Sequence, residues 1–296
     1  MEHSGGVNMN IVEKRRIFLI ISLIIILIGI IMFFVNGFNY GIDFTGGTLI
    51  EIGTEEFISV EEAREITQDF DPDISIIHGG ENQDELIIKS TLDLSNDDVT
   101  SITEGFKEKH DVKNESVLSE KIGATMGKEI KQKALLSMIV ATVAMLAYIT
   151  FRFEFKFGLS AIMALIHDIL ITISVYSILG IPINSSFIAA ILTIVGYSIN
   201  DTIVIFDRIR EETKLDRKKD IEDVVNDGIK HSFRRTINTT ITTLLAVVIL
   251  YILGVEDIKI LALPLLVGMI AGTYSSLFLA PTFWYDLKQL ETKTAK

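Results

Sequence analysis

Two adjacent polar residues, Asn200 and Asp201, lie inside an apolar run from Phe187 to Phe206 that is long enough to cross a bilayer. A carboxylate inside the hydrocarbon costs at least about 2.5 kcal/mol, so such residues face other helices or a wet cavity and usually serve a pathway. Tyr197 precedes Asp201 by four residues and therefore shares its helical face. We predict that Asp201 handles an ion or a proton. Two alternatives stay open: Asp201 could hydrogen-bond two helices together, or the helix could end early and leave it among the lipid headgroups.

A cation stands at the start of the next apolar run, which reads RRTINTTITTLLAVVILYIL. Helical spacing places Arg235, Thr239, Thr242 and Thr243 on one face of this run. A membrane helix turns such a polar face toward other helices, so we expect this face to point inward. The alternative is an interfacial arginine whose side chain extends to the headgroups.

A further pair of titratable residues, His167 and Asp168, lies near the middle of the apolar run 158–179. Adjacent residues on a helix point about 100° apart, so we expect no shared metal site. Either residue could act as a proton relay, and the alternative is hydrogen bonding between helices. The sequence has no cysteine, and His78 and His110 lack partners at metal-ligand spacing, so we predict no metal site and no cofactor.

Apolar runs separate the chain into a membrane part and one soluble part, as expected for a sequence in which 49% of residues are hydrophobic. The first run is too long for a signal peptide and no cleavage site follows it. We expect an amphipathic helix at 121–133 before the second span at 134–150. We predict a cytoplasmic N-terminal segment at 1–16, a first transmembrane helix at 17–36, an extracytoplasmic α+β domain at 37–130, a five-helix transmembrane bundle at 131–287 with a cytoplasmic loop at 208–235, and a cytoplasmic tail at 288–296.

The soluble part carries most of the negative charge. Residues 37–130 hold 22 Asp and Glu against 7 Lys and Arg, so a nucleic-acid partner is not expected. Ser59 and Glu62 form a capping-box pattern before a helix at 60–70, and a second helix is expected at 96–109. Strands at 48–52, 74–77, 85–89 and 111–119 complete the pattern. This order predicts a ferredoxin-like fold, with a sheet on one side and two helices on the other.

The distribution of cations predicts the topology. Lysine and arginine gather in the segment 208–235, whereas the loops expected on the opposite side have almost none. The positive-inside rule then places both termini in the cytoplasm of a multi-pass cell-membrane protein. Docking of this segment to a translocon or to lipid is the alternative to a plain topology signal. The cations are Arg208, Arg210, Lys214, Arg217, Lys218, Lys219, Lys230, Arg234 and Arg235.

A glycine-rich motif, GIDFTGG at 41–47, follows the first span. Its glycines supply backbone freedom, while Asp43 and Thr45 supply side chains that bond nearby backbone, which favours a tight, fixed exit from the membrane. Neither GxxxxGK[ST] nor GxGxxG is present, so the motif is no nucleotide loop.

Two of these stretches resemble one family. The run VGYSINDTIVIFDRIRE at 195–211 is similar to the signature of SecF, the smaller membrane subunit of the SecDF protein-export complex in the resistance-nodulation-division superfamily. The run GIDFTGGTLIE at 41–51 resembles the sequence after the first helix of that family. The resemblance implies structural roles for Asp43, Gly46 and Gly47, and it places Arg235 where these proteins carry an arginine opposite the fourth-span aspartate.

The resemblance also implies a function and partners. The full unit of this superfamily has two related halves, so this six-span chain is expected to need a SecD-like subunit. A SecYE-type translocon, a translocating unfolded polypeptide and membrane lipid are the other expected partners. We expect no enzyme, and an intramembrane aspartyl protease in particular is not expected, because its paired catalytic Asp motif with Gly-x-Gly-Asp is missing. The alternatives are a passive assembly factor and half of a lipid or small-molecule transporter. Carboxylates and hydroxyls suit both protons and sodium, which leaves the coupling ion open.

Overall fold

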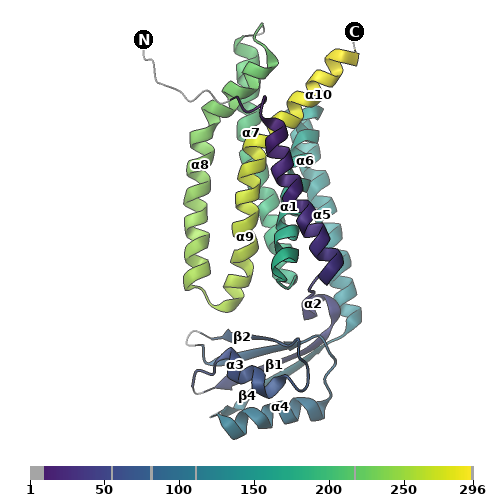
Figure 1. Ribbon diagram of the computed structural model, residues 1–296, viewed down its shortest axis with the longest axis vertical. Helices are drawn as coiled ribbons and strands as arrows, with labels where there is room; N and C mark the ends of the chain where they lie inside the picture. Colours follow the sequence, from purple (N-terminus) through teal and green to yellow (C-terminus); the bar gives the residue numbers. More distant parts are fainter. Residues whose placement is uncertain (1–9, 55, 81–82, 111, 217, 295–296) are drawn as a thin grey trace.

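The computed structural model consists of a helical bundle and a smaller sheet domain at one end of it (Figure 1). It describes residues 10–54, 56–80, 83–110, 112–216 and 218–294, so Arg217 of the predicted cation cluster lies outside the described residues. Within that part, six helices are long and apolar enough to cross a membrane. The first of them, α1, starts at the end of the bundle that is remote from the sheet domain, and the last helix, α10, ends there.

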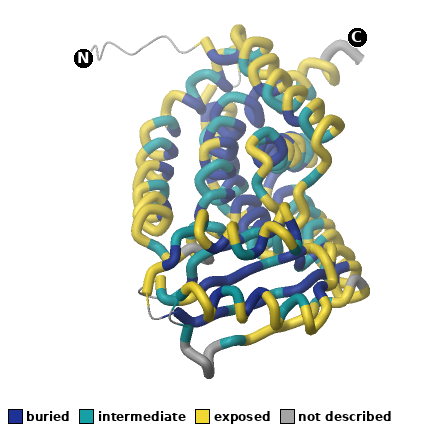
Figure 2. The backbone as a smooth tube through the Cα atoms, turned by 60° about the horizontal axis from the view of Figure 1, so that its bottom comes forward, coloured by how far each residue is buried: buried dark blue, intermediate teal, exposed yellow. Residues whose placement is uncertain are grey.

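The bundle is built from long helices that alternate in direction. Helices α6, α7 and α9 lie at its centre, whereas α1, α5 and α8 are exposed over most of their length (Figure 2). Their bounds are α1 (Arg15–Asn36), α5 (Ala124–Arg152), α6 (Phe155–Leu179), α7 (Ser185–Leu215), α8 (Ile221–Leu253) and α9 (Glu256–Tyr274), which continues through the π-helix η1 (Ser275–Leu279) into α10 (Ala280–Thr294).

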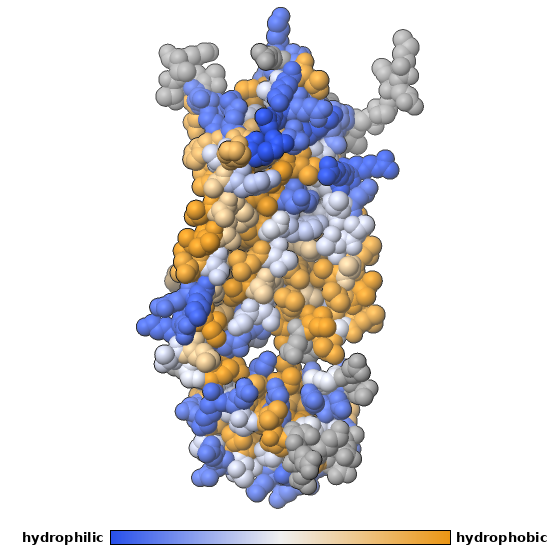
Figure 3. Space-filling view, turned by 180° about the vertical axis from the view of Figure 1, so that it is seen from behind, coloured by the Kyte–Doolittle hydropathy of each residue, from blue (hydrophilic) through white to orange (hydrophobic). Residues whose placement is uncertain are grey.

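Hydrophobic side chains cover the middle of the bundle, and hydrophilic ones gather at both of its ends (Figure 3). The isoleucines and leucines of α1 also contribute apolar surface, and many of them are about half exposed. Apolar surface of this extent would be unstable in water, so it matches a helix bundle whose surrounding solvent is the bilayer.

The sheet domain, residues 47–122, has the order βαββαβ and confirms the predicted α+β, ferredoxin-like fold. All paired strands are antiparallel, in the order β2-β3-β1-β4. Helices α3 and α4 cover one face of the sheet and enclose a core that includes Ile50, Ile88 and Phe106. The elements are β1 (Gly47–Thr54), α3 (Val60–Thr67), β2 (Ser75–Gly79), β3 (Glu85–Ser90), α4 (Asn96–Lys109) and β4 (Val112–Ile122).

Both helices of the sheet domain begin with a capping box. Ser59 and Glu62 cap α3 as predicted, and Ser95 caps α4 with Asp98 as its reciprocal partner. In each case the carboxylate accepts hydrogen bonds from the backbone and hydroxyl of the serine, and these bonds lower the pKa of Glu62 and of Asp98.

Two elements differ in extent from what the sequence suggested. The amphipathic helix expected at 121–133 is not separate: β4 continues to Ile122, and one helix, α5, then runs from Ala124 through the second span. The stretch 208–235, expected as a cytoplasmic loop between two spans, contains the end of α7, which continues to Leu215, and the start of α8 at Ile221. Arg208 pairs with Glu211 and Glu212 within the extended end of α7, and such pairs favour continued helix.

Candidate coupling site in the membrane helices

Asp201 occupies the interior of the bundle, near the middle of α7. Its side chain is almost fully buried, and its Oδ2 atom has no hydrogen-bond partner in the described part of the chain. At about 1.5 Å per residue it lies roughly 24 Å from the first residue of the helix, Ser185. The predicted buried position is therefore correct, and the helix does not end early.

Helix α8 presents two groups to this carboxylate. The Thr240 hydroxyl and the Arg235 guanidinium both interact electrostatically with Asp201. Thr240 is buried, and its hydroxyl also lies 2.8 Å from that of Thr273 in α9. Arg235 is exposed and makes no direct ion pair with Asp201 among the described residues. The interaction between the arginine and the carboxylate is therefore a longer-range attraction of opposite charges and not a salt bridge.

The polar face predicted to point inward on α8 is not the one that does so. Arg235, Thr239 and Thr242 are exposed, whereas Thr236 and Thr240 pack into the bundle. The hydroxyls of the exposed Thr239 and Thr242 donate to backbone carbonyls of their own helix, so these two residues need no partner helix in this chain. A stripe of polar residues at transmembrane depth thus remains on the outer surface of α8.

His167 and Asp168 form a second buried cluster. Asp168 is fully buried, and the His167 Nδ1 atom lies 3.0 Å from its Oδ1. The two side chains leave the helix about 100° apart, yet their polar atoms lie within hydrogen-bond distance. The His167 Nε2 atom lies 2.8 Å from the Ser22 hydroxyl of α1, so this pair joins α1 to α6.

Serines connect this second cluster to α7. Ser198 donates a hydrogen bond of 2.6 Å to Oδ2 of Asp168, and its carbonyl accepts one of 3.2 Å from Ser276. Ser276 in turn lies 2.8 Å from the Thr202 hydroxyl. Ser276 belongs to the π-helix η1, a wide turn of the kind that often marks functional positions. Ser198 therefore connects α7 to Asp168 of α6, and both Ser198 and Thr202 are connected to Ser276 of η1.

Two residues predicted beside Asp201 behave differently. Asn200 is exposed, unlike the buried Asp201 beside it. Tyr197 is half-buried and packs against the apolar group formed by Val247, Ala262 and Met269. Sequence reasoning also missed Ser22, because a single serine in an apolar helix has no periodic pattern to mark it.

The glycine-rich motif forms a tight turn at the base of the bundle. It contains the short helix α2 (Ile42–Thr45), followed by Gly46 and Gly47 at φ values of 78° and 145°. A Cβ atom on Gly47 would lie 2.1 Å from the Ser90 carbonyl oxygen, so only glycine fits there. Asp43 accepts a hydrogen bond of 2.7 Å from the backbone N–H of Ser185 at the start of α7.

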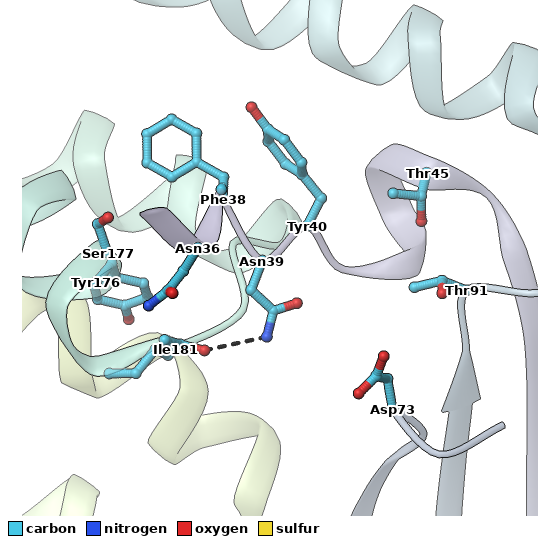
Figure 4. A pocket seen from close by; sticks show the side chains of 12 residues that line it. Asn36, Phe38, Asn39, Tyr40, Thr45, Asp73, Thr91, Tyr176, Ser177 and Ile181 are labelled. Carbon is cyan, nitrogen blue, oxygen red and sulfur yellow. Dashed lines mark hydrogen bonds between the residues drawn. The ribbon is translucent and has the colours of Figure 1, made fainter. Parts of the chain in front are cut away.

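A cavity of about 520 Å³ opens beside this turn, between the bundle and the sheet domain. Asn39, Tyr40 and Tyr176 line it from the bundle side, and Asp73 and Thr91 line it from the sheet domain (Figure 4). The Asn39 amide donates a hydrogen bond of 3.1 Å to the Gly180 carbonyl, which holds the connection after α1 against the loop after α6.

The chain matches family models for protein-export membrane proteins. The model described as "Protein export membrane protein SecD/SecF, C-terminal" matches residues 101–290, and the "SecD/SecF GG Motif" matches residues 31–56. A protein translocase subunit SecF from Petrotoga mobilis is 36% identical over 98% of this chain and 99% of its own length. SecF from Acidaminococcus fermentans is 38% identical over 93% of this chain and 96% of its own length.

Some longer relatives contain a segment similar to this chain as one part. The protein translocase subunit SecDF of Bacillus subtilis is 35% identical over 95% of this chain, which spans 38% of that protein. The crystal structure of SecDF from Thermus thermophilus, described as a translocon-associated membrane protein, superposes with a TM-score of 0.81 at 33% identity and covers 96% of this chain and 39% of that one. Because relatives named SecF are 36% and 38% identical over 98% and 93% of this chain, and both family models and the fold match, the chain belongs to the SecF family of protein-export membrane proteins.

Proposed function

We propose that this chain is an accessory subunit of the Sec protein-translocation machinery that uses the proton gradient, through Asp201, to promote polypeptide export. Its membership of the SecF family supports the role in export. The observation that carries the coupling role is the burial of Asp201 in an apolar bundle with one carboxylate oxygen unpaired. A structural aspartate would be expected to have both oxygens satisfied, as Asp168 has, because an unpaired buried polar atom is costly.

The proposed cycle has two states that differ in the charge of Asp201. When it is ionised, the carboxylate is attracted to Arg235 of α8, and α7 and α8 are drawn together. When a proton neutralises it, that attraction is lost and the two helices repack. A charge moved across 100 mV of membrane potential carries about 2.3 kcal/mol, enough to bias a two-state arrangement. The repacking would reach the sheet domain, which lies outside the membrane and acts on the emerging polypeptide.

A SecD-like partner is proposed to cover the outer face of α8. The exposed stripe of Arg235, Thr239 and Thr242 lies on a helix that is apolar enough to span the membrane. An arginine facing hydrocarbon is unfavourable, and hydroxyls at this depth favour contact with another helix. The SecDF proteins, in which a segment like this one is part of a longer chain, support such a neighbour. A SecYE-type translocon, the unfolded polypeptide and lipid complete the proposed set of partners.

The proposed topology places both termini in the cytoplasm and the sheet domain outside. It is supported by the lysines and arginines near the ends of α7 and α8 that are remote from the sheet domain. Labelling of single cysteines in intact cells tests it, since the natural chain has none. A cysteine at Glu104 should react with an impermeant reagent, whereas one at Lys218 should react only after lysis.

The experiment that tests the coupling role is export in reconstituted vesicles that contain this chain, its partner and a translocon. Collapse of the proton gradient with an ionophore should lower export by the wild-type chain. Asp201→Asn should give the lower rate whether or not the gradient is present. A passive assembly factor would instead give the same export with Asp201→Asn as with the wild type, and a sodium-driven subunit would respond to a sodium gradient alone.

A further inference from the structure

The segment after α1 is fastened to the outer end of α7, the helix that carries Asp201. Gly41 donates a backbone hydrogen bond of 2.9 Å to the Ile183 carbonyl, and Ile183 donates one of 2.8 Å to the Asn39 carbonyl. These bonds surround a parallel bridge between Tyr40 and Ile183. Ile183 lies two residues before the first turn of α7. Two stretches about 140 positions apart in the sequence are thus joined like neighbouring strands of a sheet.

Asp43 adds a connection to α7 itself. Its carboxylate accepts the hydrogen bond from the Ser185 N–H, and that N–H has no partner inside the helix because it belongs to the first turn. A carboxylate at this end is also favoured by the helix dipole. Asn184 supplies a second cap, since its side chain accepts a bond of 2.9 Å from the Phe187 N–H. Only the cap from Asp43 comes from a different element of the chain.

The same turn is held from a second side by α5. A Cβ atom on Gly127 of α5 would lie 2.6 Å from the Phe44 carbonyl oxygen, so helix and turn touch at the backbone. The connection to α1 is different. Gly37, just after α1, has a φ of 73°, and a Cβ atom there would have nothing within 4 Å. The turn therefore packs tightly against α5 and α7. Its connection to α1 passes through Gly37, which has free space around its Cβ position.

We propose that the segment Asn39–Asp43 is a rigid coupling that makes the root of the sheet domain and α7 move as one body, with Asp43 as the positioning residue that fastens it. β1 starts two residues after α2, so a displacement of the outer end of α7 is passed directly to one of the two inner strands of the sheet. A change of the backbone angles at Gly37 would absorb the resulting displacement relative to α1. This inference rests on the proposed function in so far as α7 is the helix that shifts when Asp201 changes charge.

Distances between spin labels test the coupling without any measurement of export. The full chain carries labels at two exposed positions, Glu104→Cys in the sheet domain and Thr193→Cys in α7. The wild-type background should give one narrow distance distribution. Asp43→Ala should broaden it, whereas Asn184→Ala should leave it narrow although each change removes one cap from the same helix end. An unchanged distribution with Asp43→Ala, or equal broadening with Asn184→Ala, would overturn the proposal.

A disulfide across the bridge gives a second, independent test. Neighbouring strands lie about 4.8 Å apart, within the Cα separation of about 4.4–6.8 Å that a disulfide needs, so Tyr40→Cys with Ile183→Cys should cross-link. The cross-link should restore the narrow distribution in the Asp43→Ala background, and oxidation should leave export unchanged. If oxidation stops export and reduction restores it, the joint has to open and the rigid coupling is wrong.

Export separates this inference from the proposed function. Asp43→Ala should lower gradient-driven export by about fivefold, the equilibrium factor of one lost helix cap, and Asn184→Ala should lower it less. Asp43→Asn keeps an acceptor for the Ser185 N–H and should recover most of the loss. If the proton role is wrong, export with Asp201→Asn will equal that of the wild type, and the label distances will be unaffected. If the coupling is wrong, the label distances in Asp43→Ala will show it.

Discussion

The Ser198 hydroxyl donates a 2.6 Å hydrogen bond to the Asp168 carboxylate and so joins α7 to α6 one turn before Asp201. Both residues are buried, and Asp168 is also bonded to His167. The contact explains how a fully buried carboxylate is accommodated in this bundle: each of its oxygens has a partner. It also places a fixed point on α7 close to the residue that is proposed to change its charge.

Ser198→Ala should destabilise the chain by about 1–3 kcal/mol, because one oxygen of the buried Asp168 loses its donor. Thermal unfolding of the full chain in detergent measures this change. Thr193→Ala is the matched control on the same helix, since the Thr193 side chain is exposed and its hydroxyl donates to the Ala189 carbonyl of α7 itself. Equal melting temperatures for the two variants would show that the hydrogen bond to Asp168 contributes nothing.

Gly272→Ala should be destabilising by about 1–3 kcal/mol through overpacking. The added Cβ atom would lie 2.9 Å from the Ser198 Cβ and 3.5 Å from Oδ2 of Asp168, where no space exists. Gly196→Ala in α7 is the control, because nothing lies within 4 Å of its Cβ position. That change should be neutral or stabilising by up to about 1 kcal/mol, from the better helix propensity of alanine. The reverse order in thermal unfolding would mean that α7 and α9 do not pack as described.

Local patterns in the sequence predicted the elements better than the contacts between them. The run of apolar residues around Asp201 indicated a buried carboxylate, and Ser59 with Glu62 marked the start of α3, because both signals are contained within a few residues. The contact of Ser22 with His167 could not be predicted, since it depends on which faces α1 and α6 turn toward each other. The η1 turn has no recognisable local signature either.

The prediction for α8 shows a second limit. Spacing correctly grouped Arg235 with Thr239 and Thr242 on one face, but that face is exposed in this chain. A helical pattern reports that a polar face needs shelter from lipid, and it does not say which chain provides it. The hydroxyls are satisfied by their own backbone, so the fold of this chain alone does not require them to turn inward.

The capping box of α3 should weaken in acid. The Ser59 backbone and hydroxyl donate bonds of 3.0 and 2.8 Å to Glu62, which lowers the pKa of that carboxyl from its ordinary value of 4.5. A lowered folded-state pKa means that the stabilisation is present at neutral pH and is lost as the pH falls below about 4.5 and through the folded value. Hydrogen exchange of the first amides of α3 should therefore gain protection above this range.

Glu62→Gln provides the control for that measurement, because glutamine completes a capping box without titrating. In this variant, the exchange rate in the first turn of α3 should follow only the intrinsic pH dependence of amide exchange. The loss of protection in acid should not occur. A step of the same size in the variant would assign the pH response to another group.

The most direct test of the coupling role is the dependence of export on an imposed membrane potential, in vesicles with partner and translocon. The rate should rise with potential for the wild-type chain and for Asn200→Ala, since Asn200 is the exposed neighbour on the same helix. With Asp201→Asn the rate should be low and independent of potential. A potential dependence that survives in Asp201→Asn would contradict the account and leave the chain as a membrane scaffold.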